Sequence, residues 1–525
     1  MSTSSPWAGA CALALVGVLA LVFVRRCLET RDSEAPLVCP LPPGPPGLPL
    51  VGNVVGIDTE APWLTYTEWA KTYGDLVYTQ LLGKHIVIIN SEKVAKDLLE
   101  RRSKNYSDRP LLVTNELFGM DFNSVLLPYG DRWRLHRRFF HQAFRADSVA
   151  RFAPLQQQKS FQLLRHLLEE PNQFSEHIFE YTASIVMNAV YEYDPVSRKD
   201  PMVKIVEKVI NVILDALRPD VSIIIGAFPG LLSLPSWLPG MSFKRTAASS
   251  RIWTRDCVET PFNYSLQKMS ANVGPSMIYD ALRKAEEQGI PADSMWMRCL
   301  KEAAATAFMA ASETSNSVIM TFFLMMVLFP DAQKKAQAQI DMVIGKGRLP
   351  RLQDRPSLPY IDAILRETLR YRPVAPLSVP HVTVDADVYG GYYIPKGTLI
   401  ISNLWSMAHN ESKYPRPYEF QPERFLNDDG TLKPDDTQNI AFGFGRRMCV
   451  GRHFADTSVW HAIATVLAVF TLSKPRDARG REVPVAPKFT SGLAIRPLPF
   501  PCCVAPRMEG MDAGALEQLI AASVV

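Results

Sequence analysis

The sequence predicts a mainly α-helical domain with a minor β region, preceded by one N-terminal transmembrane helix. Two observations indicate the class of the domain. Apolar residues recur at helical spacing from about residue 145 to 345, and strand-like patterns are confined to short regions before and after that stretch. Composition agrees, because 47% hydrophobic and 21% charged residues are typical of a chain that buries a sizeable core.

The N-terminal segment predicts the membrane helix. Residues Trp7 to Val24 are almost wholly apolar and are followed directly by Arg25 and Arg26. A run of this length can just span a bilayer, and a cleaved signal peptide would carry its basic residues before the run. We therefore expect an uncleaved single-pass anchor over residues 1–28, with the two arginines holding the rest of the chain on the cytosolic side.

The next segments lead into the main domain. The run Leu41–Pro49 contains five prolines and cannot form helix or sheet, so residues 29–53 are expected to be a polar and proline-rich linker. Beyond it, Leu76–Leu82 and His85–Asn90 are joined at Gly83-Lys84 and predict a β-hairpin.

The main domain is expected to cover residues 54–508. Strand character returns at Asp387–Ile394, where a Gly-Gly pair marks a tight turn. Residues 509–525 form a tail of small and apolar residues, and its composition does not reveal a role. The clearest helical runs are Phe161–Leu168, Val203–Leu217 and Lys301–Phe329.

Charge and cysteine usage narrow the classes of function. The net charge is +4, from 57 basic and 53 acidic residues, and no tract of like charges is present, so nucleic acid is not an expected partner. The eight cysteines are scattered and include no C-x-x-C pair, which fits a reducing compartment and argues against a zinc module or a thioredoxin-type site. Each cysteine must therefore be judged by its local sequence.

Cys449 has the most informative surroundings. It lies in the segment Phe442–Gly451, FGFGRRMCVG. A thiolate that binds a metal must be held rigidly with backbone amides near the sulfur, and Gly445 and Gly451 would let the backbone approach closely. Arg447 can neutralise an acidic group on a bound cofactor, the aromatic residue at the start can shield the site from water, and a helix expected after Gly451 would favour an anionic sulfur.

The alternative is that Cys449 is an ordinary buried thiol, the commonest fate of a lone cysteine. Chance is a poor explanation, because F-x-x-G-x-R-x-C-x-G arises on the order of once in ten thousand chains of this composition. The segment resembles the haem-binding signature of the cytochrome P-450 superfamily, the haem-thiolate monooxygenases. This resemblance implies haem b as the cofactor and Cys449 as its iron ligand, with Phe442, Gly443 and Gly451 among the residues that contact the haem.

Two further elements extend the resemblance. Glu367 and Arg370 are similar to the E-x-x-R pair of the family, and Arg424 in the segment PERF is similar to the arginine that completes a buried ion network. A surface pair is the alternative, and such pairs contribute little stability. Trp133 and Arg137 resemble a W-x-x-x-R element that binds a haem propionate, and their spacing of four places both on one helix face. By the same resemblance, His381 and Arg447 are further propionate donors.

The run Lys301–Phe329 is long enough for a second membrane span, but polar residues from Ser312 to Asn316 interrupt it, which favours a helix through the protein core. Its AASET segment resembles the A-G-x-[DE]-T motif of the family. Thr314 and Glu313 would then help deliver protons during oxygen activation. Ala311 replaces the usual glycine, so the local distortion of the helix does not follow from the resemblance.

The resemblance implies a monooxygenase that inserts one oxygen atom from O2 into a small molecule. No nucleotide-binding motif is present, so electrons are expected from a partner protein. The resemblance, together with the N-terminal anchor, implies NADPH-cytochrome reductase at the endoplasmic reticulum membrane, with cytochrome b5 as a second candidate. Arg132, Arg134, Arg138 and Arg452 would form a basic face for that donor. Two alternatives stay open: a reductase-independent haem-thiolate isomerase or dehydratase, and a non-catalytic haem carrier or sensor.

Apolar pocket segments favour a lipophilic substrate, such as a terpenoid, steroid, fatty or aromatic compound. The sequence does not choose among these. The sequence around His381 and Pro422 most resembles that of fungal family members that act in natural-product or xenobiotic oxidation. By the resemblance, the segments that line the pocket in this family correspond to roughly Leu111–Leu127, Phe308, Val374–Val379 and Phe489–Leu493.

Overall fold

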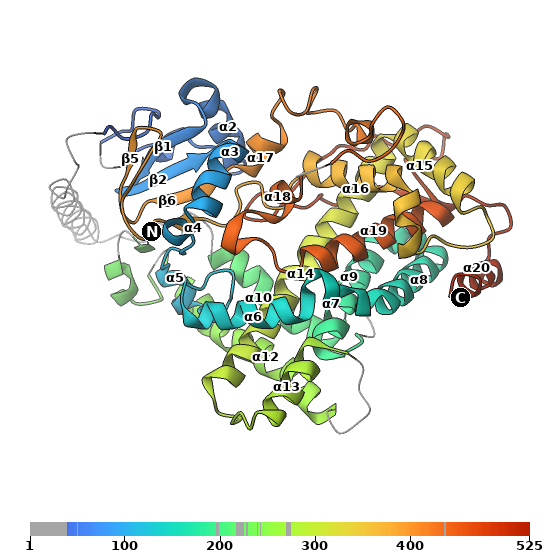
Figure 1. Cartoon of the computed structure of the whole chain (residues 1–525), viewed down its shortest axis with the longest axis horizontal. Helices are drawn as coiled ribbons and strands as arrows, with labels where there is room; N and C mark the ends of the chain where they lie inside the picture. Colours follow the sequence, from blue (N-terminus) through green and yellow to red (C-terminus); the bar gives the residue numbers. More distant parts are fainter. Residues whose placement is uncertain are drawn as a thin grey trace, which may run out of the picture.

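The computed structural model describes residues 39–49, 51–195, 199–216, 225–226, 229–238, 240–241, 243–268, 275–434 and 437–524. The anchor expected over residues 1–28 lies outside these ranges. In the described part, helices make up most of the domain and three small sheets the rest, as the sequence predicts (Figure 1).

The helices of the first half are α2 (Pro62–Tyr73), α3 (Glu92–Ala95), α4 (Ser103–Tyr106), α5 (Val113–Leu117), α6 (Asp131–Phe144), α7 (Ala146–Val149), α8 (Ala153–Glu169), α9 (Phe174–Tyr191), α10 (Pro201–Ala216) and α12 (Phe243–Lys268). Those of the second half are α13 (Met277–Glu287), α14 (Met295–Leu328), α15 (Pro330–Val343), α16 (Pro359–Tyr371), α17 (Leu404–Ala408), α18 (Thr437–Phe442), α19 (Arg452–Val469) and α20 (Ala513–Ala521).

The strands are β1 (Leu76–Leu81), β2 (Lys84–Ile89), β3 (His381–Val382), β4 (Asp387–Tyr389), β5 (Tyr392–Ile394), β6 (Leu399–Ser402), β7 (Phe470–Ser473) and β8 (Cys503–Pro506). The largest sheet has the order β1-β2-β6-β3, with β1 and β2 antiparallel and β6 parallel to β2. Both predicted hairpins are confirmed, since β1 pairs with β2, and β4 pairs with β5 around Gly390 and Gly391. These two glycines have φ values of 60° and 84°, which side chains rarely adopt.

Helix α14 forms the centre of the core. Its Ser294 side chain accepts a hydrogen bond from the Met297 amide at the start, and Pro330 follows its end. It packs against α9, α6, α12 and α19. Among the described residues, α14 is the one helix long and apolar enough to cross a bilayer, but 72% of its most apolar window is buried in the domain. The interpretation of this run as a core helix therefore agrees with the structure.

The proline-rich segment does not stand apart from the domain as a spacer. Its backbone is extended, as expected, but it lies along the sheet: Tyr78 N donates to Pro43 O at 2.9 Å, and Tyr393 N donates to Pro40 O at 2.7 Å. A side chain at Gly44 would come within 1.8 Å of the Tyr78 carbonyl oxygen. Glycine at this position is what allows the close approach.

The tail forms a helix, α20, that docks on α8 (Figure 1). Leu516 and Ile520, one turn apart, are buried against the main core. Ser523 then ties the chain end to the body: its hydroxyl accepts from Leu349 N at 2.7 Å, and its carbonyl accepts from Gln157 Nε2 at 3.0 Å.

Candidate active site

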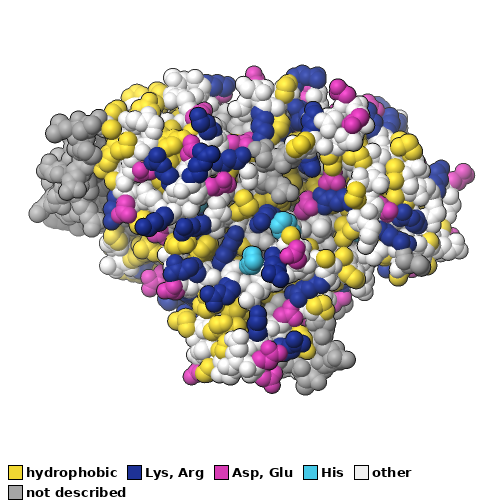
Figure 2. Space-filling model, in the orientation of Figure 1, with side chains coloured by type: hydrophobic (Ala, Val, Ile, Leu, Met, Phe, Trp, Pro, Cys, Tyr) yellow, Lys and Arg dark blue, Asp and Glu magenta, His cyan; other side chains and the backbone are white. Residues whose placement is uncertain are grey.

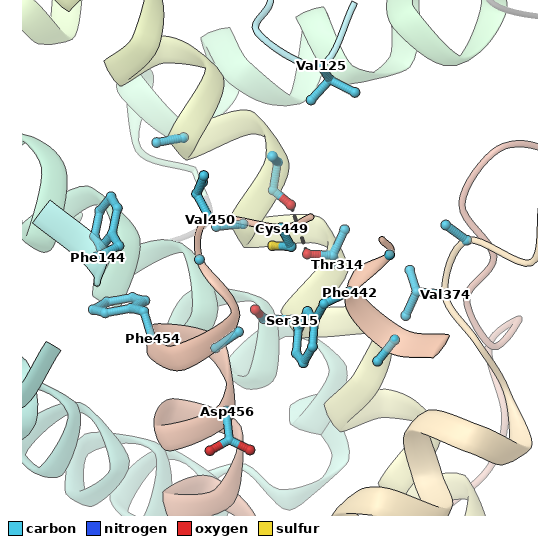
Figure 3. A pocket seen from close by; sticks show the side chains of 18 of the residues that line it. Val125, Phe144, Thr314, Ser315, Val374, Phe442, Cys449, Val450, Phe454 and Asp456 are labelled. Carbon is cyan, nitrogen blue, oxygen red and sulfur yellow. Dashed lines mark hydrogen bonds between the residues drawn. The ribbon is translucent and has the colours of Figure 1, made fainter. Parts of the chain in front are cut away.

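A cavity of about 350 Å³ lies between α14 and the loop before α19 (Figure 3). This volume is within the range of small-molecule sites. Cys449 and Val450 line the cavity from the loop, and Thr314 and Ser315 line it from α14. Its remaining α14 side chains are small or apolar: Thr306, Ala307, Ala310, Ala311, Val318 and Ile319.

The Cys449 loop is held by its backbone. Cys449 N donates to the Phe442 carbonyl oxygen at 2.8 Å, which closes the loop. Gly445 has φ 60°, and a Cβ there would lie 2.0 Å from the Leu99 carbonyl oxygen, so its predicted role in close approach agrees with the structure. At Gly451, φ is −84° and an added Cβ would meet no protein atom within 4 Å, so its role beside the sulfur and a bound cofactor stays a prediction. Gly443, with φ 80°, is the second position where the loop requires glycine.

The Cys449 sulfur is deep in the protein, and its exposed surface belongs to the cavity wall. Burial raises the pKa of the Cys449 thiol, while hydrogen bonds from the Gly451 and Arg452 amides and the nearby Arg137 guanidinium act in the opposite direction. The amides at the start of α19 therefore face the sulfur, as expected. Since a metal-bound cysteine is deprotonated outright, a metal would overcome the effect of burial.

The other described cysteines do not line this cavity. Cys299 is buried on α14 in a different cluster, with His136 and Glu302. In that cluster Glu302 accepts from Arg132 at 2.9 and 2.7 Å, and its Oε2 lies 3.2 Å from His136 Nε2. Burial would raise the pKa of Glu302, but the hydrogen bonds from His136 and Arg132 outweigh it and hold the value at about 2. This ionised carboxylate fixes α6 against α14 and so positions Trp133 and Arg137.

Buried cations line one side of the cavity. The guanidinium carbons of Arg137 and Arg447 lie 5.9 and 4.3 Å from the centroid of the Trp133 ring. Burial lowers the pKa of each arginine to about 10. In the described part of the chain neither one pairs with a carboxylate, and Arg447 is held by the carbonyls of Ser107 and Leu127 at 2.9 Å.

Arg109 belongs to the same group, and sequence reasoning missed it. It is 6% exposed, and its guanidinium donates to the carbonyls of Val125 (3.0 Å), Val379 (2.6 Å) and Pro380 (2.7 Å). Arg109 lies outside the periodic segments of the sequence and belongs to none of the motifs described above. The fold brings it to the cavity from a loop, and two of its three carbonyl partners, Val379 and Pro380, lie far away in the sequence.

His381 lines the cavity beside Arg109. Its Nδ1 donates to the Tyr106 carbonyl oxygen at 2.8 Å, which leaves Nε2 for the cavity. Burial, reinforced by the neighbouring Arg109, lowers the pKa of His381 well below its ordinary value. A carboxylate bound at this edge would favour the protonated ring.

These residues fit a dianionic cofactor such as haem. Buried arginines without a carboxylate partner are costly unless an anion binds to them, and the two propionates of haem supply that charge. The predicted propionate donors Trp133, Arg137, His381 and Arg447 all line the cavity. Cys449, Phe442, Gly443 and Gly451 line it as well.

Thr314 and Glu313 occupy different surroundings. The Thr314 hydroxyl lines the cavity and donates to the Ala310 carbonyl oxygen at 2.8 Å (Figure 3). Glu313 does not line the cavity and is ion-paired with Arg496. Helix α14 is continuous through Ala311, which lines the cavity.

The structure brings together the three residues of the expected ion network. Arg370 donates to both Glu367 carboxylate oxygens at 2.6 and 2.8 Å, and Arg424 Nε lies 3.2 Å from Glu367 Oε1. The Glu367 and Arg370 side chains are 0% exposed, so this is not a surface pair.

Only some residues of the expected pocket segments line the cavity. Val125, Val374 and Val379 line the cavity, whereas Phe308 is 1% exposed within the core and Phe489 lies against Arg372. Phe308 lies on the face of α14 that packs into the core, which the sequence pattern alone does not distinguish from the cavity face.

A cavity with a cysteine on one wall and, among the described residues, buried cations without carboxylate partners on another is a site for an anionic cofactor. The model of the cytochrome P450 family matches residues 42–504. Cytochrome P450 monooxygenase ple1 of Rhodocybe pseudopiperita is 38% identical over 91% of this chain and 91% of its own. Cytochrome P450 monooxygenase 208 of Postia placenta is 38% identical over 95% and 96%, and cytochrome P450 monooxygenase claR of Ampulloclitocybe clavipes is 36% identical over 95% and 91%.

The chain therefore belongs to the cytochrome P450 family. It is an oxidoreductase of the monooxygenase type, with haem b on an axial cysteine thiolate as its cofactor. Membership of this family implies dioxygen, a small-molecule substrate and a redox partner.

Proposed function

We propose that Cys449 is the axial ligand of the haem and that the enzyme oxidises a lipophilic small molecule. The observation that carries this proposal is the cavity itself. Cys449 is the one described cysteine that lines it, and it faces α14 across a space bordered by Arg109, Arg137 and Arg447. Bound haem supplies the iron at which dioxygen is activated, and the thiolate favours O–O cleavage.

The chain's own residues hold the cofactor and deliver protons. Arg109, Arg137, Arg447, Trp133 and His381 bind the propionates. The Thr314 hydroxyl hydrogen is already donated to Ala310 O, so its oxygen lone pairs are available to accept a hydrogen bond from a water in the cavity. That water is the proton donor, and the Glu313–Arg496 pair lies one residue away as the link toward solvent.

The substrate is lipophilic because the α14 wall and the facing Val125, Val374 and Val379 are apolar. The relatives compared above are fungal cytochrome P450 monooxygenases, and the oxidation of natural products or xenobiotics is proposed from the sequence resemblance to fungal members alone. A panel of terpenoids, steroids, fatty acids and aromatics would test this by substrate-induced shifts of the haem absorption. We expect shifts with one or more apolar classes, and shifts only with charged, polar compounds would contradict the proposal.

Electrons come from an NADPH-cytochrome reductase at the endoplasmic reticulum membrane, with residues 1–28 as the anchor. Figure 2 shows Lys and Arg side chains gathered over the face on which α6 lies. Arg134 and Arg138 are exposed there. Reductase-dependent NADPH consumption with product formation separates this proposal from an isomerase, which needs no reductase, and from a haem carrier, which forms no product. Protease protection in microsomes tests the orientation, and the catalytic domain should be digested from the cytosolic side.

A further inference from the structure

A cluster of two histidines and one glutamate lies at the corner between α8 and α9. His166 is in the last turn of α8, and His177 and Glu180 are in the first turns of α9. Each of the three offers one ligand atom, and these atoms all lie within 4.8 Å of one another. None of the three side chains lines the Cys449 cavity.

The His166–Glu180 ion pair of the cluster has an N···O distance that also suits two ligands on one cation. His166 Nδ1 lies 3.2 Å from Glu180 Oε2, and the two imidazole centroids are 5.3 Å apart. Ligands at about 2.0–2.2 Å from a tetrahedral Zn²⁺ are roughly 3.3 Å from one another.

The His177 ring has the orientation usual for a metal-binding histidine. Its Nε2 lies 3.0 Å from the Glu170 carbonyl oxygen. Because a carbonyl only accepts, Nε2–H is the donor and Nδ1 keeps its lone pair. A carbonyl that fixes the tautomer in this way is a common outer partner of ligating imidazoles. His177 is 7% exposed, so its surroundings hold this orientation.

A small cavity of about 10 Å³ is lined by all three side chains, which is close to the room that one water needs. Lys159 lines the same cavity, but its Nζ is held between the Asp194 carboxylate oxygens at 2.5 and 2.6 Å. That ion pair offsets the lysine charge. Glu169 and Glu170 add negative charge near His166, so the local field favours a cation.

We propose that His166, His177 and Glu180 bind one divalent transition-metal cation of the Zn²⁺ class, with water completing the coordination. Two imidazole nitrogens and one carboxylate suit Zn²⁺, whereas Mg²⁺ and Ca²⁺ prefer oxygen ligands. The cation stabilises the corner between α8 and α9. Tyr181, the next residue, lines the Cys449 cavity and donates to Ser458 O at 2.7 Å, so the corner supports the wall of the active site.

The test uses the tag-free, haem-loaded full chain, titrated with ZnCl2 by calorimetry and followed by thermal unfolding. We expect one equivalent to bind and Tm to rise with ZnCl2 concentration, while MgCl2 and CaCl2 have no effect. His177→Asn and Glu180→Gln should each weaken binding at least tenfold. His141→Ala, which removes an exposed histidine of α6, is the matched control and should bind like the parent.

No binding by the parent chain, or unchanged affinity in both variants, would overturn the site. The carbon-monoxide spectrum of each variant shows whether the haem site stays intact, so failure here is distinct from failure of the proposed function. If both variants misfold, anomalous scattering from zinc-soaked crystals of the parent decides. A peak between these three side chains supports the site, and its absence there refutes it.

Discussion

Thr314 and Glu313 are adjacent in the sequence, but their side chains lie in different surroundings. Successive residues of a helix point about 100° apart, so the motif places one side chain at the cavity and the other at Arg496. The bond from Thr314 to Ala310 O is a habit of threonine in helices, and it is also compatible with accepting a hydrogen bond from water. Mutation of Thr314 distinguishes a structural role of its hydroxyl from a catalytic one.

Thr314→Ala should bind haem and substrate and accept electrons, yet form less product per NADPH and release more hydrogen peroxide. We expect a fall in coupling on the order of 10²-fold, the lower end of proton-transfer contributions. Thr314→Val should behave similarly, and Thr314→Ser should retain part of the coupling. If Thr314→Ala keeps the parental ratio of product to NADPH, the hydroxyl has no part in proton delivery.

The ion network between α16 and the segment around Arg424 is the clearest prediction at the level of elements. Glu367→Ala leaves Arg370, which is 0% exposed, without its carboxylate. We expect a loss of about 3–5 kcal/mol in the free energy of unfolding, together with a lower haem-loaded yield. Glu68→Ala removes a pair whose two side chains are both 67% exposed, and it should cost less than about 1 kcal/mol. Equal losses in the two variants would mean that burial of the network contributes no special stability.

Helix α20 gives a second prediction at this level. Leu516 is 1% exposed against α8 and the core. Leu516→Ala should reduce stability by about 2–4 kcal/mol while leaving the carbon-monoxide spectrum of the folded enzyme unchanged. Val524→Ala, at a 68% exposed position in the same tail, serves as the control. An unchanged Tm for Leu516→Ala would show that the tail does not contribute to folding.

Some elements of the fold could be predicted from the sequence and others could not. Strong periodicity predicted α14, and the glycine turn predicted the hairpin of β4 and β5, because these signals are local. The tail helix was missed because two apolar residues one turn apart are a weak pattern until α8 is there to cover them. Arg109 was missed for a similar reason, since its carbonyl partners come from distant parts of the chain.

At the scale of the whole molecule, the structure narrows the set of arginines expected to form the basic docking face. Arg132 is held by Glu302, so it contributes less than predicted, and Arg452 donates to Cys449 O at 3.2 Å. Arg134, although paired with Asp131, and Arg138 are exposed on α6 and are the residues to test. Replacing both with glutamate should lower reductase-driven turnover several-fold, mostly at low salt, because exposed charges are screened as salt rises.

Haem content and turnover driven by an added peroxide should be unchanged in this double variant, since neither uses the reductase. Lys334→Glu, on α15 and 73% exposed, is the control for a change of net charge. Parental turnover with the reductase at every salt concentration would remove Arg134 and Arg138 from the docking face.

The central claim is that the Cys449 thiolate holds the haem. The most direct measurement is the carbon-monoxide difference spectrum of the reduced full-length protein, recorded for the parent and for Cys449→Ala. Cys299→Ala is the matched control, because that cysteine is buried on α14 and does not line the cavity. We predict the thiolate-type spectrum for the parent and for Cys299→Ala, and its complete loss in Cys449→Ala. Retention of that spectrum in Cys449→Ala would contradict the account.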